Sequence, residues 1–598
     1  MSNFMTPSGA RATMKYKLEI DNRSGPKRSL RETGRKFLPL FATEKWPFAA
    51  AVAAIVFSSL ATLIAPVLIV RIIDNDIRLK NTHGLVIGAL VVLAIYAAGA
   101  VASYTQVLTM GGVGRRVLFH LRNALFLKLQ DLPVAFFNEN KAGDLISRLN
   151  NDTDKLNQFV AQALMQFVGS VFLISGAAIF LVSLNFKLGL AALTPAIGVL
   201  LLTRFTAAWI KRRNLGSLQA LGGMSSEVQE SLNNFKVIVA FNRVDYFRWK
   251  FNSANEKNFA ASVSAGFANN MFMPLYGLAS QLAQLIVVAY GIYLIEAGQT
   301  TVGLLIGFLL YVNNLYGPMR QLATVWSSFQ LAMAGLDRIS EVLALESNLP
   351  VIDAPAVETD SVLAFRQVWF QYPGGKEVLR DVSFTLEKGK AYALVGPTGG
   401  GKTTTASLMA RLYDPTQGSV LLNGRDIRSY TPDQRARKIG FILQDPFLFS
   451  GTVRDNIIYG NEPYQGYSSQ QLSELLEEAN LSTLVSRFSE GLDTVVTTSG
   501  NSISLGQKQL IAFMRAALRR PELLILDEAT ANIDTVTEEL LEEILDKLPA
   551  TTTRVIIAHR LNTIDKVDQI FFVNSGEITL AGSMDHAVDM LLREKRAS

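Results

Sequence analysis

Gly396-Pro397-Thr398-Gly399-Gly400-Gly401-Lys402-Thr403 decides the fold of the second half of the chain, because it fits the pattern GxxxxGK[ST]. Apolar residues at 391–395 predict a buried strand before it, and a helical pattern follows it. Glycines in such a loop let backbone N–H groups surround phosphate oxygens, helped by the N-terminus of the next helix. We expect Lys402 to reach the β- and γ-phosphates of a nucleotide and Thr403 to ligate Mg²⁺.

Two further apolar runs end in polar residues that suit the same nucleotide. Asp527 and Glu528 follow residues 523–526, and His559 ends the run that begins at 553. In open α/β sheets, ligands bind at the carboxyl ends of parallel strands. Asp527 suits the Mg²⁺ water shell, Glu528 suits polarising an attacking water, and His559 suits a γ-phosphate contact. Standing alone, these residues would indicate a solvated acidic turn and a structural histidine.

Two segments between these runs are open to two interpretations. Gln444 follows the apolar residues 439–443, and Ser504-Leu505-Gly506-Gln507 precedes a helical pattern. A Ser with a Gly at a helix N-terminus predicts a second anion site. An ordinary capped helix start is the alternative for the same residues.

Long stretches without charged residues dominate the first half of the chain. A helix needs about 20 apolar residues to cross a bilayer, and five of the six stretches reach that length. The fourth reaches it if Arg204 extends toward the headgroups. We therefore predict six transmembrane helices, at about 47–70, 85–108, 160–185, 187–209, 268–295 and 301–325.

Loop charge predicts the orientation of these helices. The long connections 115–155 and 204–257 carry seven and nine Lys/Arg, whereas the three short connections carry three, one and none. Positive loops stay in the cytoplasm, so both termini and the second half of the chain are predicted to be cytoplasmic. The long connections are expected to be helices that continue beyond the bilayer, with short elements near 143–148 and 234–238.

Composition divides the chain into four segments. We predict a mobile tail at 1–30, a membrane domain at 31–340 that starts with an amphipathic elbow helix, a linker at 341–361 and a nucleotide-binding domain at 362–598. Net charge is +6 over 1–46, +9 over 47–340 and −9 over 341–598. The basic residues therefore lie where they set orientation and meet anionic lipid, and they give no indication of nucleic-acid binding. The absence of Cys excludes disulfides, thiol nucleophiles and Cys-ligated zinc, and only four His argue against a multi-His metal site.

Six spans followed by these motifs in this order resemble an ABC exporter half-transporter of the type IV, multidrug-resistance kind, over about residues 31–595. The resemblance implies a membrane all-α domain of six transmembrane helices with long cytoplasmic extensions, followed by an α/β P-loop ABC nucleotide-binding domain. It also implies two coupling helices, near 138–152 and 233–248. The implied ATP-binding residues are Tyr372, which stacks on adenine, the Walker A loop and its neighbour (Gly396, Pro397, Thr398, Gly399, Gly400, Gly401, Lys402, Thr403 and Thr404), Gln444 of the Q-loop and Asp527 of Walker B.

The remaining implied roles concern catalysis and the partner subunit. Thr403, Gln444 and Asp527 would hold Mg²⁺, and Glu528 and His559 would be catalytic. In this family ATP binds between Walker A of one subunit and the signature motif of the other, so a second half-transporter is the implied partner. The signature residues that act on the partner's ATP are Ser504, Gly506 and Gln507, with Asp534 in the D-loop.

Several positions depart from the family pattern. The signature has Ile503 for Leu and Leu505 for Gly, Thr498 replaces the usual exporter Glu, and the D-loop is ANID, where SALD is common. These departures resemble those of bacterial heterodimeric multidrug exporters, in which one nucleotide site is degenerate. The resemblance therefore favours a heterodimer over a homodimer, with this chain supplying intact Glu528 and His559.

The fifth and sixth predicted spans carry the candidate substrate residues. Charges are absent from the middle of the spans, which argues against a proton-relay pump. A cavity lined by amide, Met and aromatic groups suits large hydrophobic or amphipathic molecules, although such amides also bond neighbouring helices. We expect ATP-driven multidrug-type export across the bacterial cytoplasmic membrane, with a lipid flippase, a peptide exporter and a membrane-tethered regulatory ATPase as alternatives. The candidate residues are Asn269, Asn270, Met273, Gln281, Tyr311 and Asn313.

Overall fold

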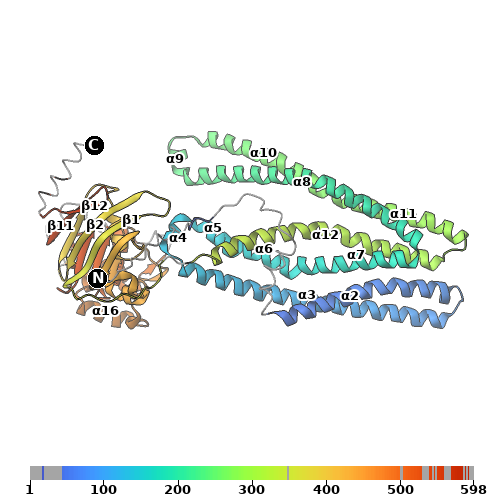
Figure 1. The fold of residues 1–598 in the computed structure, drawn as a ribbon, viewed down its shortest axis with the longest axis horizontal. Coiled ribbons are helices and arrows are strands. Elements are labelled where there is room, and N and C mark those ends of the chain that lie inside the picture. Colours follow the sequence, from blue (N-terminus) through green and yellow to red (C-terminus); the bar gives the residue numbers. More distant parts are fainter. Residues whose placement is uncertain are drawn as a thin grey trace, which may run out of the picture. The chain divides into compact units, whose positions relative to one another are not determined.

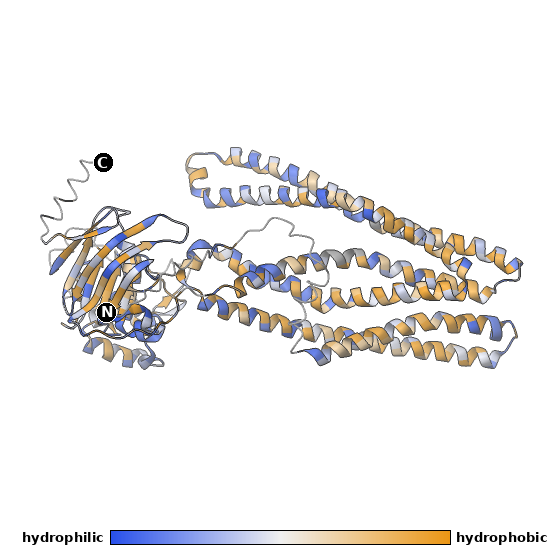
Figure 2. Ribbon diagram, in the orientation of Figure 1, coloured by the Kyte–Doolittle hydropathy of each residue, from blue (hydrophilic) through white to orange (hydrophobic). Residues whose placement is uncertain are grey.

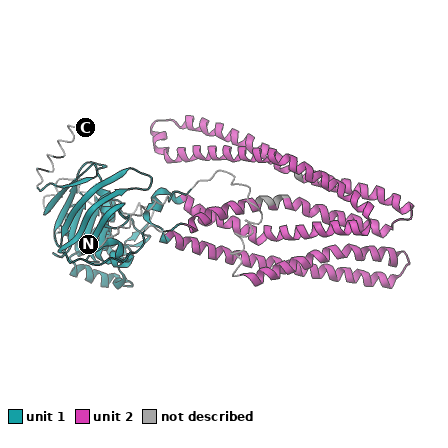
Figure 3. Cartoon of the chain, viewed as in Figure 1, with its two compact units in different colours: residues 1–19, 130–142, 345–598 teal, residues 20–129, 143–344 magenta. Residues whose placement is uncertain are grey.

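The computed structural model describes residues 16–18, 44–346, 349–497, 503–527, 538–541, 544–545, 548–557, 567–582, 586 and 590. Contacts divide the chain into two compact units, which Figure 3 colours separately. Unit 1 comprises residues 1–19, 130–142 and 345–598, and unit 2 comprises residues 20–129 and 143–344. Each unit is described by itself.

Unit 2 is a bundle of long helices (Figure 1). The described residues contain six helices long and apolar enough to cross a membrane, which confirms the six predicted spans. Figure 2 shows apolar residues along these helices and more hydrophilic residues toward α5 and α9. The helices are α2 (Lys45–Arg71), η2 (Ile72–Ile77), α3 (Thr82–Asp131), α5 (Ala142–Ser147), η3 (Arg148–Asp152), α6 (Thr153–Gln158), η4 (Phe159–Ala163), α7 (Leu164–Leu184), α8 (Phe186–Asn233), α9 (Phe235–Ala240), α10 (Val244–Asn270), α11 (Phe272–Glu296) and α12 (Val302–Leu343).

Three helices of unit 2 are much longer than a bilayer is thick. α3, α8 and α12 contain 50, 48 and 42 residues. At about 1.5 Å per residue, each exceeds a hydrocarbon core of about 30 Å. The long basic connections are therefore mostly helical, with the ends of α3 and α8 extending into them, and α5 and α9 are the short elements predicted within them.

Packing and caps fix the order of the helices in unit 2. α12 packs on α2, α6, α7 and α11, and α8 packs on α7, α10 and α11. Asp74, in η2, accepts hydrogen bonds from the Thr301 hydroxyl at 2.5 Å and from the Gly303 N–H at 3.0 Å. Thr301 in turn accepts from the N–H of Leu304 at 3.1 Å. These bonds satisfy N–H groups of the first turn of α12 that have no partner inside the helix.

Unit 1 combines strands with short helices. Its helices are α4 (Val134–Glu139), α13 (Lys402–Met409), η5 (Ile427–Ser429), α14 (Pro432–Lys438), α15 (Val453–Ile458), η6 (Glu462–Tyr464), α16 (Ser469–Glu478), α17 (Ser482–Val485), η7 (Gly491–Asp493) and α18 (Leu505–Ala517). Its strands are β1 (Ser361–Gln371), β2 (Glu377–Glu387), β3 (Ala391–Val395), β4 (Gln417–Leu422), β5 (Arg425–Asp426), β6 (Ile439–Ile442), β7 (Gly451–Thr452), β8 (Val495–Val496), β9 (Leu523–Asp527), β10 (Thr553–Ile557), β11 (Gln569–Asn574) and β12 (Glu577–Leu580).

Two sheets form the centre of unit 1. The larger has the order β12-β11-β3-β10-β9-β6, in which all neighbouring pairs are parallel except β11 with β12. The smaller is antiparallel, with the order β2-β1-β4-β5. β3 and β9 flank β10, so their carboxyl ends lie at the same edge of the sheet. The predicted fold class, a six-helix membrane domain followed by an α/β domain, is confirmed.

The predicted segment boundaries differ slightly from the observed elements. α12 ends at Leu343 and β1 begins at Ser361, so the connection spans 344–360 rather than 341–361. The start of α2 at Lys45 is described, whereas most of the predicted tail and of the elbow helix lies outside the described residues.

Candidate nucleotide site

The glycine-rich loop connects β3 to α13 at the carboxyl edge of the parallel sheet. Gly396 has a φ of +147°, and a Cβ at this position would lie 2.0 Å from the carbonyl oxygen of Val573. A Cβ on Gly400 would lie 2.6 Å from the same oxygen. Because no side chain fits against this carbonyl, only glycine lets the loop pass so close to β11.

Lys402 begins α13 and folds back over the loop. Its side chain is 5% exposed, and Nζ donates hydrogen bonds to the carbonyl oxygens of Gly396 at 2.8 Å and Pro397 at 3.0 Å. The ammonium therefore lies beside the loop whose N–H groups are predicted to surround phosphate. A positive charge at this position attracts the negatively charged oxygens of a bound triphosphate.

Thr403 and Asp527 bring hydroxyl and carboxylate oxygens together. The Thr403 hydroxyl donates to Asp527 Oδ1 at 3.4 Å, and Asp527 is 4% exposed at the end of β9. Oxygens of this kind suit Mg²⁺, which takes one or two protein ligands and completes its shell with water and phosphate. The residues present therefore fit the predicted ion. Gln444, the third predicted ligand, is exposed and lies just beyond β6, the strand next to β9.

Tyr372 lies just after β1 in a cluster of aromatic rings. Its hydroxyl is 3.0 Å from the Thr404 hydroxyl. Its ring packs edge-on against Phe370 (centroids 4.9 Å apart) and Tyr413 (5.2 Å). Both pairs are T-shaped, with interplanar angles of 83° and 89°.

Tyr413 was not predicted as a site residue, yet it links this cluster to α4. Burial raises the pKa of Tyr413, so its hydroxyl stays protonated near neutral pH. That hydroxyl accepts a hydrogen bond of 2.7 Å from Asn138 of α4. No motif or spacing relates positions 138 and 413, so sequence reasoning had no signal for this contact.

α4 is held within unit 1 by further contacts. Asn140 donates to the carbonyl oxygens of Tyr16 at 2.8 Å and Phe136 at 2.7 Å and accepts from the N–H of Leu18 at 3.0 Å. The Tyr16 and Phe136 rings pack edge-on, with centroids 6.5 Å apart. α4 leads directly into the segment 138–152, in which a coupling helix is predicted.

The signature segment begins a capped helix. The Ser504 hydroxyl accepts from the N–H of Gln507 at 3.2 Å, and Gln507 Oε1 accepts from the N–H of Ser504 at 2.9 Å. This reciprocal pair is a capping box at the start of α18. The capped start is thus present, while the predicted role of Ser504, Gly506 and Gln507 toward a partner's ATP stays a prediction.

Three predicted residues, Glu528, Asp534 and His559, lie outside the described residues. Glu528 directly follows Asp527 at the end of β9, and His559 follows β10 by two residues. Their catalytic and D-loop roles stay predictions.

The candidate substrate residues lie in different surroundings. Asn269 exchanges two hydrogen bonds with Asn214 of α8, at 2.9 and 3.1 Å. Asn313 accepts from Gln284 at 3.1 Å, which joins α12 to α11. Tyr311 is fully buried, stacks on Phe180 and donates to the carbonyl oxygen of Leu63, so the structure places it within the helix packing. The other candidates are all exposed: Asn269, Asn270, Met273, Gln281 and Asn313.

Two family descriptions match the chain. Residues 48–319 match the ABC transporter transmembrane region, and residues 379–531 match the ABC transporter family. The first range contains most of the long helices of unit 2, and the second contains the glycine-rich loop and the end of β9.

Proteins similar to this chain include bacterial transporters. A multidrug resistance ABC transporter ATP-binding and permease protein of Lactococcus lactis is 32% identical, over 83% of this chain and 84% of its own length. A fatty acid ABC transporter ATP-binding/permease protein of Mycobacterium bovis is 31% identical, over 82% and 77%. The solved structure of a bacterial Atm1-family ABC exporter with ATP bound is 26% identical, with a TM-score of 0.74 over 92% of this chain and 96% of that one. The chain belongs to the ABC exporter family, as a half-transporter with one transmembrane region and one ATP-binding domain.

Proposed function

We propose that the chain is one half of a dimeric exporter that uses ATP to move hydrophobic or amphipathic compounds out across the bacterial cytoplasmic membrane. The observation that carries the proposal is the pairing of Thr403 with Asp527 beside the glycine-rich loop, in a chain with six apolar helices. The Thr403–Asp527 pair suits a nucleotide with Mg²⁺. The six apolar helices suit a route through the membrane. The names of the multidrug and fatty acid relatives support an apolar cargo.

The proposed hydrolysis uses groups at one edge of the parallel sheet. Backbone N–H groups of the loop and Lys402 bind and orient the triphosphate, and Thr403 and Asp527 would hold Mg²⁺, which would supply positive charge to the phosphates when bound. The proposed base that accepts a proton of the attacking water is Glu528, which follows Asp527 in the sequence. The proposed role of His559 is a contact with the γ-phosphate. Glu528→Gln is expected to remove most ATP turnover while ATP binding persists, and turnover near that of wild type would contradict the assignment.

The proposed transport cycle needs two half-transporters. ATP bound between two nucleotide-binding domains favours their closed dimer, which turns the cavity outward, and hydrolysis resets it. Ile503 and Leu505 depart from the signature pattern, which favours a heterodimer with a second half-transporter. Co-purification of a second half-transporter from the native membrane is expected. A self-dimer of this chain alone with full drug-stimulated ATPase activity would contradict the heterodimer.

The alternatives give different results in transport assays. A flippase would respond to phospholipid in an ATPase assay without moving a dye, and a peptide exporter would move peptides rather than a dye. A membrane-tethered regulatory ATPase would hydrolyse ATP without ATP-dependent uptake into inverted vesicles. The proposed exporter accumulates a hydrophobic dye such as Hoechst 33342 in those vesicles only when ATP is present.

A further inference from the structure

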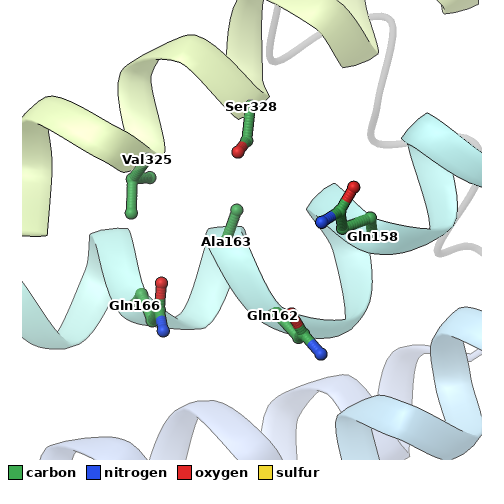
Figure 4. A pocket seen from close by; sticks show the side chains of 6 residues that line it. All are labelled: Gln158, Gln162, Ala163, Gln166, Val325 and Ser328. Atoms are coloured by element: carbon green, nitrogen blue, oxygen red, sulfur yellow. The ribbon is translucent and has the colours of Figure 1, made fainter. Parts of the chain in front are cut away.

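A polar cavity lies in unit 2 between the α6–α7 stretch and α12. Its volume is about 190 Å³. Figure 4 shows Ala163 and Ser328 pointing toward one another, with Gln162 and Gln166 extending from the lower side of their helix. It is lined by Gln158, Gln162, Ala163, Gln166, Val325 and Ser328.

The three glutamine side chains are exposed and carry unused hydrogen-bonding capacity. Among the described residues, none of the carboxamides of Gln158, Gln162 and Gln166 has a hydrogen-bond partner. Each carboxamide offers two N–H donors and one carbonyl acceptor. They lie on the more polar side of the apolar residues of a helical stretch, 142–184, that is long and apolar enough to span a membrane. Their donors and acceptors are therefore available to a molecule that enters the cavity.

A local change in helix geometry accompanies the glutamines. η4 is a π-helical segment, Phe159–Ala163, between the regular helices α6 and α7. In an α-helix of about 3.6 residues per turn, side chains four apart drift around the axis. The π segment changes the regular angular spacing of side chains between Gln158 and Gln166. Such segments occur frequently at functional sites.

The amides that the sequence singled out differ from these glutamines. Asn269 and Asn313 are engaged in bonds between helices, with Asn214 and Gln284 respectively. Their hydrogen-bonding groups serve packing, which was the alternative interpretation of those residues. The carboxamides along α6–α7 are instead available to a ligand.

We propose that this cavity binds a neutral hydrogen-bonding group, an amide or a hydroxyl, of the transported amphipathic molecule, while Ala163 and Val325 contact its apolar part. The proposal rests on the proposed export function and names the chemistry of its cargo. None of the six lining residues is charged, so a cationic or anionic group would lose water without gaining a countercharge. A neutral amide, in contrast, exchanges hydrogen bonds with water for bonds with the glutamines.

The test compares two probes that differ in one group. The probes are 1-pyrenedodecanamide and 1-dodecylpyrene, and the measurement is the concentration that half-maximally stimulates ATPase activity of the reconstituted transporter. Wild type is expected to respond to the amide at an about tenfold lower concentration, since one neutral hydrogen bond changes binding by about two- to tenfold. The triple variant Gln158→Leu, Gln162→Leu, Gln166→Leu is expected to lose this preference while responding to the hydrocarbon as wild type does. Gln106→Leu is the control, because Gln106 lies in α3 and is not among the residues that line the cavity, and this variant is expected to keep the preference.

A labelling experiment covers the case in which the triple variant does not fold. The chain has no cysteine, so Gln162→Cys introduces a single thiol. The amide probe is expected to slow its reaction with a maleimide at least about fivefold, and the hydrocarbon is expected to slow it less. An unchanged amide preference in the folded triple variant, or equal protection by both probes, overturns the proposal. A thiol blocked without any probe also overturns it, because the partner subunit then covers the cavity.

Failure of the export function gives a different result. A wild-type transporter that responds to the hydrocarbon but not to the amide overturns the cavity proposal alone. A wild-type transporter that no probe stimulates and that accumulates no dye overturns both.

Discussion

The amide of Asn138 donates a hydrogen bond of 2.7 Å to the hydroxyl of Tyr413, although 275 residues separate them. The Tyr413 ring packs edge-on against Tyr372, the residue predicted to stack on adenine. One side chain of α4 is therefore two contacts away from the proposed base-binding ring. Because α4 leads into the predicted coupling segment, we predict that these contacts transmit nucleotide binding to α4.

Tyr413→Phe removes this bond and keeps the ring. We expect a loss of about 0.5–1.5 kcal/mol in stability, the usual net contribution of one hydrogen bond. We also expect transport per ATP hydrolysed to fall, because α4 loses its link to the aromatic cluster. Tyr430→Phe is the matched control, because Tyr430 is equally buried (8% exposed) and donates to the Leu422 carbonyl oxygen at 2.8 Å. The control should lose similar stability with unchanged coupling, and equal coupling in both variants would exclude the route.

Arg148 of η3 is a buried charge that connects α5 to α12. It is 1% exposed and bonds to Asp144 at 3.0 Å, Glu341 at 2.7 Å and the carbonyl oxygen of Arg338 at 2.6 Å. Arg148→Ala is expected to destabilise unit 2 by about 1.5–3 kcal/mol, because it removes charge-assisted hydrogen bonds to the half-buried carboxylates of Asp144 and Glu341. Thermal unfolding of the detergent-solubilised chain measures the loss.

Arg248→Ala is the matched control for Arg148. Its ion pair with Asp245 has side chains 75% and 98% exposed. Exposed pairs contribute about 0–1 kcal/mol, so this variant should unfold close to wild type. Equal destabilisation by the two variants would show that the Arg148 network is not the cause.

Two glycines of the phosphate loop separate steric collision from backbone strain. Gly396→Ala places a Cβ 2.0 Å from the Val573 carbonyl oxygen, whereas at Gly399, with a φ of +85°, a Cβ meets no atom within 4 Å. The first variant is expected to lose ATP binding. In the second variant the expected cost is only that of a left-handed backbone at a residue with a Cβ, about 1–2 kcal/mol in free energy. Binding of a fluorescent ATP analogue compares them, and equal affinities would contradict the geometry of the loop.

Glu522 predicts a pH dependence of stability in unit 1. Burial raises its pKa, but hydrogen bonds from Lys438 and Asn423, each 2.5 Å long, outweigh burial and hold the pKa below its usual 4.5. A depressed folded-state pKa gives stability that is present above the unfolded pKa and lost as the pH falls through the folded one. Glu522→Gln should therefore lower the unfolding temperature near neutral pH and flatten its fall below about pH 4.5. The exposed Glu490→Gln is the control, and an unchanged acid limb in Glu522→Gln would contradict the linkage.

The sequence was informative where chemistry repeats in short motifs or in long apolar runs. The loop at 396–403 placed Lys402 and Thr403, and charge-free stretches predicted the six spans, because both signals are local. The sequence did not predict contacts between segments that are far apart in the chain. Asn138 with Tyr413, Arg148 with Glu341 and Asn214 with Asn269 depend on how helices and strands pack, which spacing alone does not encode. The same limit explains why Gln158, Gln162 and Gln166 were not singled out.

The central claim is that ATP hydrolysis at the Thr403–Asp527 site drives export. Its most direct test is ATP-dependent accumulation of Hoechst 33342 in inside-out membrane vesicles that contain the native transporter, with wild type compared with Glu528→Gln. We predict accumulation in wild-type vesicles with ATP and Mg²⁺, and at least about a tenfold lower rate in the variant or without ATP. Wild-type vesicles that hydrolyse ATP without accumulating dye, or Glu528→Gln vesicles that accumulate it at the wild-type rate, would contradict the claim.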